Sequence, residues 1–187
     1  MTTLTQNIKA RLPSLQQIWP VFSIILFVIF SWMLYRFSYE LPGWLYYMRV
    51  TNILILLAYM LSFSLVESLL ILGFILLLSM IFPARYFKSV FVAQGSIQVF
   101  IITALAYALR RRVEYFAAME GWIFAGLCLG LIVILVLNMI ILSKIFSRFP
   151  VVEKWVSSLA DRFTIFLYLY TPLGVLSALV IVVRNIF

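Results

Sequence analysis

The segment Ile53–Phe82 constrains the fold more than any other part of this chain, because it is almost entirely apolar and contains one charged residue, Glu67. An apolar segment of this length belongs in lipid. As a single α-helix it would be about 45 Å long at about 1.5 Å per residue, whereas the hydrocarbon core of a bilayer is about 30 Å thick. The segment is therefore either one strongly tilted helix or two helices joined by a turn.

These two alternatives give Glu67 different roles. In one long helix, Glu67 is a carboxylate in the middle of the membrane, where an ionisable group indicates an ion-binding or proton-handling site. In the other, the helices are about Trp44–Ser62 and Leu65–Phe82, and Ser64 and Glu67 form an S-x-x-E capping box. The stretch between them lacks the Gly, Pro or Asn that tight turns usually contain. We favour two helices, because each then matches the bilayer and Glu67 lies near its surface.

Composition supports a membrane protein throughout. The chain has 187 residues, of which 66% are hydrophobic and only 11% charged, too few to cover the surface of a soluble domain. The apolar runs are continuous rather than alternating, which excludes a β-barrel and leaves helices.

The sequence thus predicts an all-α, polytopic transmembrane helical bundle with six transmembrane helices, or five if Ile53–Phe82 is one helix. A polar N-terminal tail, residues 1–18, precedes a single integral membrane domain, residues 19–187. Near residues 151–161, Val152, Trp155, Val156 and Leu159 recur at helical spacing and predict a short helix at the lipid headgroups. Six spans would place both ends of the chain on one side. The remaining predicted spans are Trp19–Phe37, Val90–Leu109, Gly121–Ser143 and Phe163–Arg184.

The positive charge indicates lipid rather than nucleic acid. The net charge is +8, but the Lys and Arg side chains lie mostly between apolar segments, where they contact anionic headgroups. We expect this role for Arg110, Arg111 and Arg112. The Lys and Arg residues of the whole chain are divided almost equally between the two predicted sides of the membrane, so the orientation of the protein in the membrane stays open. The chain has no histidine and one cysteine, Cys128, and we expect neither a metal site nor a cofactor.

Several polar and small residues lie within predicted spans. Gln94 and Gln98 are one helical turn apart, and they either bond neighbouring helices together or line a path for a solute or a lipid headgroup. Asn138 should point inward toward a partner, because an unpaired amide in lipid is costly. Gly126 and Gly130 form a G-x-x-x-G motif that allows close approach of two helices, either inside the bundle or against another protein.

No catalytic constellation emerges, since the six acids form no paired motif and there is no phosphate loop or serine elbow. We therefore expect a non-catalytic integral membrane protein, multi-pass, acting as a scaffold or accessory subunit in a larger membrane complex. Its expected partners are the bilayer and either other subunits or further copies of itself. The alternative is a small transporter or channel for an ion, a small solute or a lipid, with Glu67, Gln94 and Gln98 as its candidate residues.

Overall fold

The computed structural model describes residues 13–81, 90–110 and 121–186, and within these ranges every regular element is an α-helix. Five of the described helical segments are long and apolar enough to cross a membrane, which confirms the predicted all-α, multi-pass architecture. The helices are α2 (Leu15–Tyr47), α3 (Val50–Ile81), α5 (Phe91–Arg110), α7 (Gly121–Arg148), α8 (Pro150–Arg162) and α9 (Thr164–Ile186).

The favoured division of Ile53–Phe82 into two helices is wrong, because α3 is one helix of 32 residues. Ser64 is not a cap: its carbonyl accepts a hydrogen bond from Ser68 Oγ at 2.7 Å inside the helix. Ending a helix here would leave several backbone N–H and C=O groups unpaired in lipid, and no turn-forming residue offsets that cost. The five-span alternative holds, and it predicts that the two ends of the chain lie on opposite sides of the membrane.

The first helix is also longer than predicted and includes Pro42 and Trp44, which we had expected in a connection and at the start of the next span. The chain reverses instead at Met48 and Arg49, the only two residues between α2 and α3. At the other end of α2, Ser14 N donates a hydrogen bond to Gln17 Oε1 at 3.1 Å. This S-x-x-Q pair occupies the position of a capping box, the role that we had assigned to Ser64 and Glu67.

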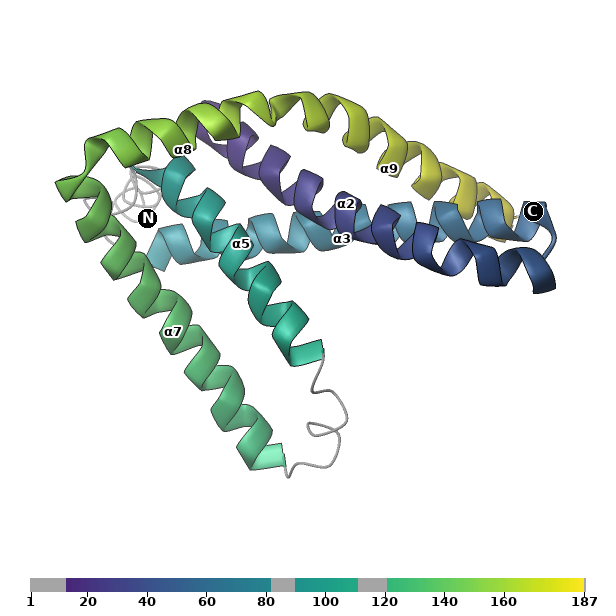
Figure 1. Ribbon diagram of the computed structural model, residues 1–187, viewed down its shortest axis with the longest axis horizontal. Helices are drawn as coiled ribbons and strands as arrows, with labels where there is room; N and C mark the ends of the chain where they lie inside the picture. Colours follow the sequence, from purple (N-terminus) through teal and green to yellow (C-terminus); the bar gives the residue numbers. More distant parts are fainter. Residues whose placement is uncertain (1–12, 82–89, 111–120, 187) are drawn as a thin grey trace, which may run out of the picture.

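Helices α2, α3 and α9 lie along one another and form the best-packed part of the protein (Figure 1). Aromatic rings fill the contact between α2 and α9, where Phe30 stacks on Tyr170 with 4.8 Å between ring centroids. Gly174 allows α9 to approach α3 closely, since a Cβ at that position would lie 2.9 Å from Leu65 Cβ.

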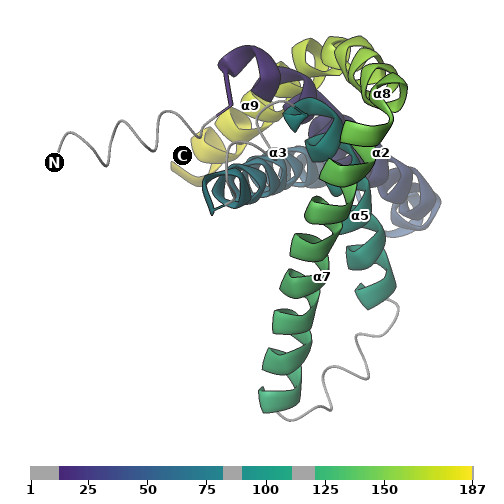
Figure 2. The ribbon, with the colours of Figure 1, turned by 90° about the vertical axis from the view of Figure 1, so that its left-hand side faces the viewer.

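Helix α5 crosses this three-helix unit at an angle, and α7 extends away from it (Figure 2). The first half of α5 is buried against α2 and α8, with Phe91, Ala93 and Val99 fully covered. The second half, from Phe100 onward, is largely exposed because α5 diverges there from its neighbours. This divergence creates the groove described below.

The predicted short helix is α8, which is separated from α9 by Phe163 alone. Ala160 is buried toward the other helices, and Val156 packs beside Phe146 of α7. Trp155, in contrast, is 70% exposed, and Val152 is exposed with it. An outward apolar face of this kind suits contact with the lipid headgroup region.

Candidate functional site

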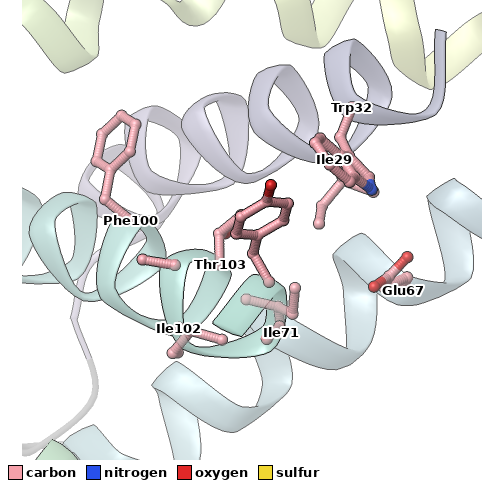
Figure 3. A pocket seen from close by; sticks show the side chains of 10 residues that line it. Ile29, Trp32, Glu67, Ile71, Phe100, Ile102 and Thr103 are labelled. Atoms are coloured by element: carbon pink, nitrogen blue, oxygen red, sulfur yellow. The ribbon is translucent and has the colours of Figure 1, made fainter. Parts of the chain in front are cut away.

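Glu67 lies in a groove between α2, α3 and α5, and the groove has a volume of about 670 Å³. Helix α2 contributes Ile29 and Trp32, and α3 contributes Ile71 beside Glu67 (Figure 3). The diverging half of α5 forms the opposite wall, with Phe100, Ile102, Thr103, Ala104, Ala106 and Tyr107. A single carboxylate therefore lies at the edge of an otherwise apolar and aromatic groove.

The aromatic wall has a defined geometry. The rings of Trp32 and Tyr107 meet edge to face with 5.6 Å between their centroids, which joins α2 to α5 across the groove. Trp32 also contacts Tyr35 at 5.9 Å. Because Thr103 Oγ1 donates to its own helix at Val99 O, 2.8 Å away, its hydroxyl hydrogen is already used. Glu67 thus has the groove's strongest free hydrogen-bond acceptor.

A second groove of about 510 Å³ adjoins the first and shares Ile29, Trp32 and Glu67 with it. Arg36 lines this second groove, but its Nη2 atom lies 3.1 Å from Glu40 Oε1 on the same helix. Within the described ranges, Glu67 makes no hydrogen bond and no ion pair. Arg36 is thus already paired, and the Glu67 carboxylate is not.

The two glutamines lie in the buried half of α5, away from the groove. Gln94 is 1% exposed, and its Nε2 donates to the carbonyl of Met139 on α7 at 2.6 Å. Gln98 is fully buried, and neither of its polar atoms has a hydrogen-bond partner in the described part of the chain. Gln94 therefore connects α5 to α7 through a backbone carbonyl, as predicted for a pair that bonds neighbouring helices together.

Helix α7 carries the remaining predicted residues. A Cβ added to Gly126 or Gly130 would meet no atom within 4 Å, so no described helix packs on this motif. Asn138 is half-buried and makes no side-chain hydrogen bond to another described residue. Arg110 is the last residue of α5, whereas Arg111 and Arg112 lie outside the described residues.

No known protein family, curated protein or solved structure matches this chain. The candidate site consequently rests on the residues of this protein alone.

Glu67 was predicted from the sequence, but the aromatic residues that line the groove with it were not. Phe100, Thr103 and Tyr107 are spaced by three and four positions, which places them on one face of α5. That spacing is visible in the sequence. The helix that this face meets depends on where α5 diverges from α2, and no local pattern encodes that.

Proposed function

We propose that this multi-pass membrane protein is a non-catalytic scaffold or accessory subunit, and that α7 contacts the neighbouring chain. The observation that carries the proposal is the face of α7 formed by Gly126, Gly130, Val133 and Leu137, here called the open face. These residues recur at helical spacing, and all four are exposed. They lie opposite Leu135, Met139 and Phe146, which are buried toward the rest of the protein.

Helix α7 is the most apolar span and the least covered. Only 11% of its most apolar stretch is buried inside the protein, compared with 50% for α2. Exposed Leu or Ile alone would not indicate a partner, since lipid tails are as apolar as these side chains. The identity of the exposed residues on the open face is therefore the relevant evidence.

Small residues and an amide favour a protein neighbour over lipid. An open G-x-x-x-G pair gains its packing energy only when another helix approaches closely. Asn138 lies about 100° around the helix from Leu137, between the open face and the buried side, and its amide has no side-chain bond within the described residues. In hydrocarbon such a group costs free energy until it finds a partner. A transmembrane helix packed on the open face would satisfy the glycines, and a polar side chain from that helix or from a second one beside it would satisfy the Asn138 amide.

The test is purification from native membranes in a mild detergent, followed by mass spectrometry of the co-purifying chains. We expect a defined partner in the parent protein and its loss in Gly126→Leu and Gly130→Leu. Gly73→Leu is the matched control, since Gly73 is an equally open glycine on α3. A parent protein that leaves the membrane as a monomer contradicts the proposal, as does a partner retained by both α7 variants.

A second candidate is a small transporter or channel. The continuous α3 supports it, because Glu67 then lies in the middle of an apolar helix, and Pro172 interrupts the hydrogen bonding of a second span, α9. The test is solute or ion flux into liposomes that contain the purified protein. Flux that is unchanged in both Glu67→Gln and Gln98→Leu excludes these residues from the pathway.

A further inference from the structure

The position of Glu67 along α3 sets its depth. Glu67 lies midway between Ile53 and Ile81, the limits of the apolar part of the helix within the described residues. About 21 Å of helix therefore extends on either side at about 1.5 Å per residue. Whatever the tilt, a helix centred on a hydrocarbon core of about 30 Å places this carboxylate near the middle. An unpaired negative charge there is costly, and a cation that reaches the same depth relieves that cost.

The protein supplies no such cation to Glu67 from its described residues. Arg36 lines the adjoining groove, but its guanidinium is bonded to Glu40. The other residues of both grooves are apolar, aromatic or hydroxyl-bearing. A ligand that carries a positive charge could therefore pair with Glu67 in this groove.

The groove resembles a binding site for an organic molecule in both size and lining. Its volume of about 670 Å³ falls within the range of about 300–1,000 Å³ typical of small-molecule pockets. Trp32 lies at the Glu67 end of the groove and Phe100 at the other end (Figure 3), and Tyr107 also lines it. Aromatic rings attract cations through their negative faces. A metal ion suits the site poorly, because Mg²⁺ and Ca²⁺ require six or more oxygen ligands. No group of three His, Cys, Asp or Glu side chains lies together in the described ranges.

We propose that this groove binds lipophilic organic cations, meaning molecules with one positive charge and an apolar or aromatic body. The charge lies against the Glu67 carboxylate, and the body lies between Trp32 of α2 and the wall formed by Phe100 and Tyr107 of α5. A free cation fits better than a lipid ammonium headgroup. Headgroups lie about 15 Å from the bilayer centre, whereas a lipophilic cation partitions into the hydrocarbon itself.

The experiment measures equilibrium binding of radiolabelled tetraphenylphosphonium to the full chain in lipid nanodiscs, with empty nanodiscs as the measure of partition into lipid. Tetraphenylborate has the same shape and the opposite charge, so it separates charge recognition from hydrophobic binding. We expect saturable binding of the cation and none of the anion. Glu67→Gln, which keeps the size and removes the charge, should weaken cation binding about tenfold or more, whereas Glu67→Asp should retain most of it.

Two further variants test the geometry. Trp32→Leu should weaken binding by a few fold and Trp32→Phe by less, since Phe keeps an aromatic face. Glu153→Gln is the matched control, because it neutralises a carboxylate on α8 that lines neither groove. Each variant is compared with the parent for its elution volume and helical content, so that unfolding is not mistaken for lost binding.

Equal affinity of the parent and folded Glu67→Gln for the cation overturns the proposal, and so does equal binding of cation and anion by the parent. The proposal is independent of the subunit function. Binding is measured on the purified chain alone, so it survives if no partner is found. Partner association, conversely, should be unchanged in Glu67→Gln.

Discussion

The contact of Gly174 with Leu65 allows a quantitative prediction for Gly174→Ala. The added Cβ would lie 2.9 Å from Leu65 Cβ and 3.1 Å from its Cδ2. Leu65 Cβ is bonded to the backbone of α3 and cannot rotate away, so α9 or α3 has to move. Overpacking of this kind costs about 1–3 kcal/mol, while replacing Gly by Ala inside a helix returns about 0.5–1 kcal/mol.

Gly73→Ala isolates the packing cost. It gains the same helix propensity, but nothing lies within 4 Å of its new Cβ. The difference in unfolding free energy between the two variants is then the cost of the clash alone. At about 2–4 °C per kcal/mol for a chain of this size, Gly174→Ala should melt about 2–12 °C below Gly73→Ala.

The assay follows the melting midpoint of the purified variants in one detergent, by loss of the monodisperse peak after heating. Gly95→Ala should fall between the two, because its Cβ would lie 3.1 Å from the movable methyl groups of Val21. If Gly174→Ala melts at or above Gly73→Ala, the close approach of α3 and α9 is refuted.

Three further predictions test the span count, the buried glutamines and Glu67. If α3 is continuous, Val66→Cys in a Cys128→Ser background should not react with a membrane-impermeant maleimide added to either side of the membrane. It should react once detergent dissolves the membrane. Labelling in intact membranes would support the two-helix division instead. Gln98→Met should stabilise the protein by about 1–3 kcal/mol, because it removes a buried amide with both polar atoms unpaired. Gln94→Met also removes one unpaired oxygen but loses a hydrogen bond worth about 1 kcal/mol, so it should stabilise less; equal melting midpoints would contradict this. Finally, a hydrophobic carbodiimide should modify Glu67 in intact membranes and a water-soluble one should not, as measured by mass spectrometry of the peptide; the reverse preference would place Glu67 in water.

The sequence predicts helices well wherever hydropathy and charge change together. Helices α5, α8 and α9 begin and end within a few residues of their predicted bounds, because arginines, a proline or a phenylalanine turn mark their ends. The division of Ile53–Phe82 was wrong because a local capping motif was given more weight than the cost of unpaired backbone groups in lipid. A capping box between Ser64 and Glu67 arises by chance in a Ser-rich helix, and it matters only where the backbone actually opens.

The sequence predicts one residue of the candidate site but not its surroundings. A lone carboxylate in an apolar run is visible without a structure, so Glu67 could be identified from sequence. Its surroundings depend on the angle between α5 and α2, which is set by contacts such as those of Val21 with Gly95. Such angles follow from side chains far apart in the chain, and the periodicity of one helix contains no information about them.

The close contact between Gly174 and Leu65 also has a consequence for biosynthesis. These residues are about 110 positions apart, so at about 5–20 residues per second the ribosome makes Gly174 about 5–20 s after Leu65. Throughout that interval, the side of α3 that will carry α9 faces lipid or an insertion factor. This close interface is therefore among the last to form, and a slow codon or a stalled ribosome before α9 would leave an inserted but incomplete intermediate.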